Sequence, residues 1–336
     1  MDKIVIVGTP FFSYTQSVHS AFVKAGYKSI CFTFPKQKAV IGKIPILKYF
    51  FNMWFHIKNQ GLFLKLVNAV ERGDTVLFFG INYFSKNKLN ALKKRYNLKY
   101  ILWFIDSIYS FQPFYDILDI ADIVFTYNKH EVDDVKGGNA KVLFMPLMCD
   151  SQFYYPKSLP KTVDLYFIGS LSKRIEFFEK LLSEIDKYQL NIIIDGTYSK
   201  HKLKLRKKKH PYFYKYYRGE KLSASEINEM YNKTKLCINL QPSQAKSALN
   251  IRTFEIAGSG ALQITNGNKQ IINELFSTEN EILYFNDISD LASKIVVVNN
   301  NYSKYETYRE AAYNRVINEH TTDMRVKTII NELNKL

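Results

Sequence analysis

The sequence predicts an α/β protein of two domains, each built around a parallel sheet. The chain has 336 residues, more than one typical hydrophobic core accommodates. Short apolar runs alternate with helical patterns, as in parallel sheets covered by helices. A strand–loop–helix–strand opening occurs twice, near residues 3–34 and 163–194, on either side of a proline-marked linker at 150–162. We expect an N-terminal domain over 1–155, a C-terminal domain over 156–318 and a final helix over 319–336.

Six short apolar runs in the N-terminal domain are predicted to be buried strands. They cover residues 3–8, 29–34, 74–80, 99–105, 122–127 and 141–146. A helical pattern covers 16–24 and stops before Gly26, and another helix is expected from about Lys129. No G-x-G-x-x-G fingerprint follows the first strand, so this opening alone does not indicate dinucleotide binding.

Residues 41–70 form an unusually aromatic segment with interspersed lysines. One interpretation is a pair of helices, or a single helix, packed into the core. The alternative is a basic and aromatic face that contacts a membrane surface or a lipid-linked acceptor.

The C-terminal domain repeats the alternation of strands and helices. Strands are predicted at 163–169, 190–194, 236–240, 261–265 and 281–285, and helices at 175–188, 271–276 and from 288 to the end. Ser223 and Glu226 have the spacing of a capping box for a helix that ends at Lys233. The basic, tyrosine-rich segment 201–218 is predicted to be a solvated surface helix and loop, with nucleic-acid binding as the alternative.

The composition favours an anionic partner. The net charge is +16 and the pI is near 9.4, which suits a nucleotide diphosphate, a phospholipid surface or nucleic acid. Part of the lysine excess is attributable to genomic base composition, so the charge is weak support for nucleic acid. Three widely separated cysteines without a CxxC pair indicate buried free thiols in a reducing compartment. The first ten residues do not resemble a signal peptide, and no uncharged apolar run is long enough for a transmembrane helix.

Polar residues at predicted strand ends mark a candidate site in the N-terminal domain. Asp106 follows the strand at 99–105, and Tyr127, Asn128 and His130 follow the strand at 122–127. In open parallel sheets, ligands bind at the carboxyl ends of strands, so these side chains are expected near one cleft. Each of them is also a plausible capping or surface residue.

A second candidate site opens the C-terminal domain. Gly169 and Ser170 end a predicted strand, and Lys173 and Arg174 lie at the start of the following helix. Backbone N–H groups, a hydroxyl and two cations there suit a diphosphate. The alternative is an ordinary basic helical turn on the surface.

The stretch 249–265 combines a short acid-bearing helix, two glycines and a strand. Arg252 and Glu255 are three residues apart and can lie side by side on the helix, after which Gly258 and Gly260 end it. This arrangement can bring a carboxylate to a ligand. It is equally an αβ connection in which the two residues form a local ion pair.

With these residues in view, the chain resembles glycosyltransferases of the GT-B fold, closest to the CgeB-like branch of the group 1 type. The resemblance rests on residues 164–170 with Arg174, on 236–240, on 250–265 and on 314–325, and the segment 122–156 is similar to that family's domain junction. It covers the chain from about residue 120 onward. It implies two Rossmann-like domains facing across a cleft, the first on the acceptor side and the second holding a nucleotide-sugar, with the last helix packing back toward the N-terminal domain.

The resemblance also implies roles for individual residues. Glu255 would bind the ribose hydroxyls, and Arg252 would support Glu255 or reach the phosphates. Gly169, Ser170 and Arg174 would hold the diphosphate, whose charge must be stabilised as it leaves. Asn250 belongs to the same nucleotide-sugar-binding segment. No metal or other cofactor is expected, and the sequence contains no Asp-x-Asp-type carboxylate pair.

One position departs from the pattern of many retaining relatives. They carry a second glutamate eight positions before the ribose-binding one, and here that position is Ser247. Ser247 and the loop from 243 to 249 remain candidates for contacting the donor sugar or phosphate. An inverting transfer would need a general base, for which Asp106 is the first candidate and His130 the second, followed by His19 and Asp150.

The expected activity is a metal-independent transfer of a sugar from a nucleotide-sugar to a polysaccharide, lipid-linked or protein acceptor in cell-surface glycan biosynthesis. The expected location is the cytoplasm, with peripheral contact at the inner face of the membrane as a possibility. The alternatives are a GT-B-fold sugar-nucleotide epimerase and a basic protein that binds nucleic acid or membranes.

Overall fold

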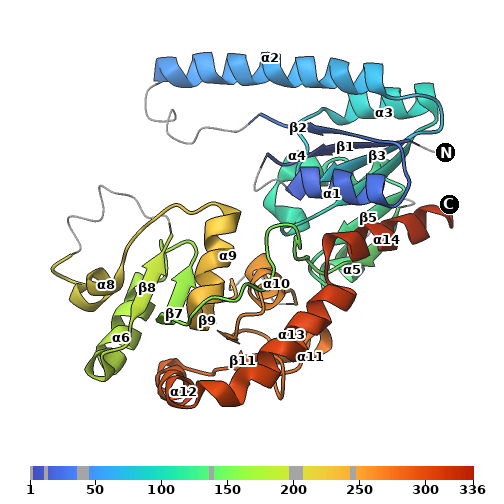
Figure 1. Cartoon of the computed structure of the whole chain (residues 1–336). Coiled ribbons are helices and arrows are strands. Elements are labelled where there is room, and N and C mark those ends of the chain that lie inside the picture. The colour runs from blue at the N-terminus through green and yellow to red at the C-terminus, as the bar shows by residue number, and fades with distance from the viewer. Residues whose placement is uncertain (1–2, 11–13, 36–44, 136–139, 197–206, 243–246) are drawn as a thin grey trace. The chain divides into compact units, whose positions relative to one another are not determined.

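The computed structural model describes residues 3–10, 14–35, 45–135, 140–196, 207–242 and 247–336, although not the side chains of 45–48 (Figure 1). The chain forms two compact units. Unit 1 comprises Met1–Leu147 and Thr322–Leu336, and unit 2 comprises Met148–Thr321. Each unit contains a parallel sheet with helices, so the predicted α/β class with two Rossmann-like domains is confirmed.

Unit 1 has a six-stranded sheet in the order β2-β1-β3-β4-β5-β6, with every neighbouring pair parallel. The strands are β1 (Ile4–Gly8), β2 (Ser29–Thr33), β3 (Thr75–Phe79), β4 (Lys99–Trp103), β5 (Ile123–Thr126) and β6 (Lys141–Phe144). All six predicted strands are present. The strand order reverses between β1 and β3, because the chain moves to β2 on one side and continues from β3 on the other.

The helices of unit 1 are α1 (Tyr14–Lys24), α2 (Pro45–Ala69), α3 (Lys86–Tyr96), α4 (Gln112–Tyr115), α5 (Glu131–Asp134) and α14 (Thr322–Leu333), with short 3₁₀ turns at Ile108–Ser110 and Leu118–Ile120. One core joins sheet residues such as Val5 and Phe78 to Leu62 and Leu66 of α2 and Leu89 of α3. The segment 41–70 therefore contains one long helix, and among the side chains of this helix that the structure describes, the buried ones lie on one side of its C-terminal half.

The two ends of the chain meet in unit 1, where α14 packs against α1. Arg325 of α14 donates to the carbonyl oxygens of Pro146 (2.7 Å) and Leu147 (2.9 Å). The division falls before Met148 rather than after residue 155, because the following residues belong to unit 2. There the Cys149 N–H donates to the His320 carbonyl at 2.8 Å, and Cys149 is buried.

Unit 2 has a five-stranded parallel sheet in the order β11-β10-β9-β7-β8. The strands are β7 (Val163–Ile168), β8 (Ile192–Asp195), β9 (Thr234–Asn239), β10 (Gln263–Thr265) and β11 (Leu283–Tyr284). The helices are α6 (Ile175–Ile185), α8 (Pro211–Tyr216), α9 (Ala224–Lys233), α10 (Ile251–Gly258), α11 (Lys269–Leu275), α12 (Ile288–Asn300) and α13 (Glu306–Glu319), with 3₁₀ turns at Asp186–Tyr188 and Tyr302–Tyr305. The strand order reverses between β7 and β9.

Local signals in unit 2 are borne out. Ser223 and Glu226 form the predicted capping box at the start of α9. Cys149 and Cys237 are buried free thiols as predicted, whereas Cys31 is only half-buried. Among the described helices, none combines the length and apolar character needed to cross a membrane.

Candidate functional site

A cavity lies at the carboxyl ends of β1, β3 and β4 in unit 1, next to the point where the strand order reverses. Its volume is about 300 Å³. Thr9, Gly80 and Asp106 contribute to its lining from the ends of these three strands, and Phe104 and Phe111 make part of it apolar. A cavity at this place in an open parallel sheet is where a ligand is expected.

Asp106 is an exposed carboxylate in the lining of this cavity. Its Oδ1 atom accepts a hydrogen bond from the Ser107 N–H at 3.0 Å. The neighbouring Tyr127 is buried, and the pKa of its phenol is raised by burial and by the negative charge of Asp106. The structure therefore places an accessible carboxylate against an apolar wall, where it can meet an acceptor hydroxyl.

Glu131 organises this region, although the sequence analysis did not single it out. Its carboxylate is buried and accepts four hydrogen bonds. The donors are Ser107 Oγ (2.6 Å), the Ile108 N–H (3.2 Å), Thr126 Oγ1 (2.6 Å) and Asn128 Nδ2 (3.1 Å). These bonds tie the loop that carries Asp106 to the loop after β5. The partners in the first loop are 23 and 24 residues away, so no local sequence signal reveals them.

The other predicted bases do not line this cavity. His130 is exposed and lies at the start of α5. The His19 Nδ1 atom is 2.9 Å from Ser29 Oγ, and Asp150 is buried in unit 2, where its Oδ1 accepts from the Gln152 N–H at 3.1 Å. Asp106 alone of the four lines the cavity at the sheet switch point.

In unit 2 the loops after β7 and β8 touch through two glycines. Gly169 N–H donates to the Asp195 carbonyl at 3.3 Å. Gly196 has φ = +134°, and a Cβ atom there would lie 1.9 Å from the Gly169 carbonyl oxygen. Only glycine fits this position, because the backbone is left-handed and the neighbouring loop is too close. The predicted glycine loop is thus held in a fixed shape.

Arg174 joins the loop after β7 to the end of β9. Its Nη2 atom donates to the Leu240 carbonyl at 2.9 Å and its Nη1 atom to the Ser170 carbonyl at 3.3 Å. The guanidinium packs over the Phe167 ring, and burial lowers its pKa. Arg174 therefore bridges the β7–β9 switch point, and the exposed Ser170 lies beside it.

Asn250 is the N-cap of α10 and fastens that helix to β9. Its Oδ1 accepts from the Thr253 N–H at 3.2 Å, while its Nδ2 donates to Asn239 Oδ1 at 2.9 Å and to the Leu240 carbonyl at 3.1 Å. Ser247 is buried just before this cap. The predicted donor loop from 243 to 249 falls partly outside the described residues, at 243–246.

Glu255 and Arg252 form an ion pair inside unit 2. Arg252 Nη1 donates to Glu255 Oε2 at 2.6 Å and also lies 3.5 Å from the Tyr231 hydroxyl. The Glu255 side chain is 2% exposed, whereas that of Arg252 is 22% exposed. Tyr154 hydrogen-bonds to Glu255, and the pKa of its phenol is raised by burial and by that carboxylate. The predicted local ion pair is therefore present, and the carboxylate holds the more accessible guanidinium in place.

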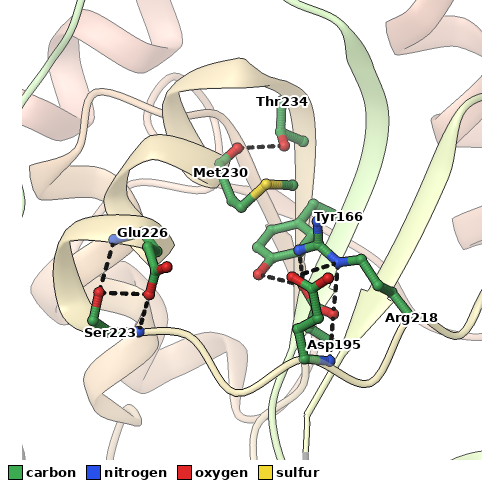
Figure 2. A network of polar contacts seen from close by, with 8 residues as sticks. Tyr166, Asp195, Arg218, Ser223, Glu226, Met230 and Thr234 are labelled. Atoms are coloured by element: carbon green, nitrogen blue, oxygen red, sulfur yellow. Dashed lines mark hydrogen bonds and ion pairs between the residues drawn. The ribbon is translucent and has the colours of Figure 1, made fainter.

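Another buried carboxylate of unit 2, Asp195, lies at the end of β8 and is drawn in Figure 2. It pairs with Arg218, accepts from the Tyr166 hydroxyl at 3.2 Å and accepts from the Glu220 N–H at 3.1 Å. Phe213 of α8 is fully buried. The described end of the basic segment, residues 207–218, is thus a mostly exposed helix and loop, as predicted, that Phe213 and Arg218 fasten to the domain, while residues 201–206 lie outside the described part of the chain.

No cluster of three or more His, Cys, Asp or Glu side chains suited to a metal ion occurs among the residues that the structure describes.

Comparisons with known proteins agree with this geometry. Residues 173–331 match a family model described as glycosyl transferase-like. No curated protein matches the chain. Among solved structures, sucrose-phosphate synthase from Thermosynechococcus elongatus is 12% identical, with full coverage of both chains and a TM-score of 0.69.

Two further solved structures are also similar to this chain over the full length of both proteins. HepE from Anabaena in complex with UDP-glucose is 11% identical with a TM-score of 0.67. The UDP-forming α,α-trehalose-phosphate synthase from Burkholderia vietnamiensis is 11% identical with a TM-score of 0.65. These likenesses establish the fold over the whole chain. The whole chain therefore has the GT-B fold of these structures, and residues 173–331 match the glycosyl transferase-like family.

Proposed function

We propose that this glycosyltransferase moves a sugar from a nucleotide-sugar to a polysaccharide, lipid-linked or protein acceptor in cell-surface glycan biosynthesis, without a bound metal ion. The observation that carries the proposal is the cluster at the β7–β9 switch point. Arg174 and Asn250, the N-cap of α10, both donate to the Leu240 carbonyl there, and Arg174 also donates to the Ser170 carbonyl in the loop after β7. Cations and backbone N–H groups at such a point suit a diphosphate.

Arg252, rather than Glu255, is the side chain of this pair that is open to a ligand. Glu255, which is 2% exposed, would orient Arg252 through their ion pair. Arg252 and Arg174 would stabilise the charge on the leaving diphosphate. In unit 1, Asp106 would accept the proton of the acceptor hydroxyl as that oxygen attacks the sugar.

A panel of nucleotides and nucleotide-sugars tests the donor class. We expect one nucleoside diphosphate and its sugar conjugate to raise the melting temperature of the protein, and we expect Arg252→Met to abolish this shift. Glu229→Gln is the matched control, because Glu229 pairs with Lys233 on α9, away from the switch point. A chain that no nucleotide stabilises would refute the proposal.

Product analysis separates transfer from epimerisation. Incubation of the best donor with a glycan acceptor should release free nucleotide and a new glycoside. Conversion of the donor to an isomeric nucleotide-sugar, with no nucleotide released, would instead establish an epimerase.

A further inference from the structure

Helix α2 is apolar on the side that faces away from the core. Leu62 and Leu66 face the core, whereas Phe50 (56% exposed), Ile57 (60%) and Leu64 (62%) do not. The exposed strip consists of Phe50, Met53, Trp54, Ile57 and Leu64. Phe50, Met53, Ile57 and Leu64 are separated by three, four and seven residues, which places them on one side of the helix, and Trp54 adjoins Met53. A contiguous strip of exposed large apolar side chains is typical of an interaction site.

The charges around the exposed strip are positive. Helix α2 contains no acidic residue between 45 and 69, and Lys58 and Lys65 lie along one edge of the strip. Lys58 also lies over the Trp54 ring, 6.0 Å from its centre. Tryptophan and lysine beside an apolar face are typical of helices that lie in a membrane interface.

A cavity of about 290 Å³ lies along the other edge of α2, lined by residues of this helix, of the loop before α3 and of α3 itself. His56, Asn59, Phe63 and Lys88 are among its lining residues. Lys88 donates to Gln60 Oε1 at 2.6 Å. The side-chain oxygen of Asn59 is buried and has no hydrogen-bond partner within the described part of the chain. The cavity thus offers a cation for a phosphate and an acceptor for a hydroxyl.

We infer that α2 lies on an anionic phospholipid surface, with the exposed strip inserted among the acyl chains and the α2–α3 cavity receiving a hydroxyl-bearing phosphate headgroup. A second copy of the chain is a poorer occupant. A twofold interface through α2 would place the same lysine-bearing face against itself, and like charges oppose such contact. The inference adds a partner to the proposed enzyme, and its test requires neither donor nor activity.

The test is sedimentation of the full chain with phosphatidylcholine vesicles that contain 30% phosphatidylglycerol, compared with phosphatidylcholine alone. We expect binding to the anionic vesicles only, and we expect it to decrease as salt is added. Trp54→Ser with Ile57→Ser should weaken binding by at least about tenfold, because two apolar side chains no longer insert. Lys58→Glu with Lys65→Glu should weaken it by a similar factor at low salt.

Two controls keep the result specific. Val297→Ser with Tyr188→Ser removes two comparably exposed apolar side chains from unit 2 and should leave binding unchanged. Lys88→Ala should weaken binding several-fold, whereas Lys94→Ala, on another face of α3, should not. Circular dichroism confirms that each variant folds.

Three outcomes would overturn the inference. They are a wild-type chain that stays in the supernatant with anionic vesicles, a Trp54→Ser/Ile57→Ser variant that binds like the wild type, and a dimer in light scattering that this variant dissociates while no vesicle binding occurs. The last would assign the exposed strip to a second copy of the chain. Nucleotide-induced stabilisation is measured in a separate experiment. A chain that does not bind vesicles can therefore still be shown to bind the donor, and the two proposals are tested independently.

Discussion

Glu255 and Asp106 are both carboxylates that the sequence marks as functional, yet their surroundings differ. Glu255 is enclosed in unit 2, with Arg252 and Tyr154 as partners. Asp106 is exposed in the lining of a cavity in unit 1. A charge that is buried and paired maintains a geometry, whereas a charge that is open to a cavity can exchange a proton with a substrate. We therefore propose that Glu255 positions Arg252 and that Asp106 takes part in the chemistry.

The largest expected effect comes from Asp106→Asn. If Asp106 is the general base, kcat should fall by about 10²- to 10⁴-fold while the Kd of the donor changes little. Steady-state transfer assays and donor titrations measure the two quantities. Asp116→Asn, which alters another exposed aspartate of unit 1 bonded to Gln112, should retain full activity. Equal activity of both variants would remove Asp106 from the reaction.

Glu255→Ala should mainly affect folding. It removes the buried partner of Arg252, and we expect the free energy of unfolding to fall by about 2–3 kcal/mol. Urea denaturation measures this change, with Glu229→Gln expected to cost less than about 0.5 kcal/mol. A Glu255→Ala protein as stable as the wild type would contradict a structural role for this carboxylate.

Lys161, unlike the two carboxylates, carries a charge that its surroundings in the folded protein disfavour. Burial and the positive charge of Arg309 lower its pKa to about 8, from 10.5 in the unfolded chain. Between these two pH values the unfolded state binds more protons than the folded state. The cost in folding free energy of burying the charged lysine therefore disappears as the pH rises. Lys161→Met should stabilise the protein by about 1–2 kcal/mol at pH 7, after discounting for solvent screening, and by less at pH 10. A stability gain that does not depend on pH would count against this explanation.

Ser223→Ala tests a contact that is encoded locally and lies far from both carboxylates in the sequence. It removes the capping box with Glu226, and the expected loss is about 1 kcal/mol of unfolding free energy. The Kd of the donor should not change. Thermal melts and donor titrations, made in parallel, show whether stability and binding respond separately.

The sequence alone was sufficient to predict the strands of the two sheets and the capping box at the start of α9. Runs such as 75–79 and 163–168 are apolar because parallel strands are buried on both faces, and Ser223 and Glu226 are only three residues apart. The place of Asp106 at the carboxyl end of the sheet was also predictable, because it lies a few residues after a strand of that sheet, β4.

Other features depend on contacts between distant residues. Glu131 is bound to Ser107, and Arg218 to Asp195, across 24 and 23 residues, and neither pairing has a local pattern. The sequence also could not decide whether α2 is packed into the core or exposed on one side, since an aromatic helix has the same sequence pattern in both cases.

The most direct test of the division of roles is calorimetric titration of the preferred donor into wild type, Arg252→Met and Asp106→Asn. Our account predicts that Arg252→Met weakens donor binding by at least about tenfold, because a charge-assisted bond to phosphate is lost. Asp106→Asn should bind the donor within about twofold of the wild type, since its role is confined to the acceptor. Unchanged affinity in Arg252→Met, or a large loss in Asp106→Asn, would contradict the account.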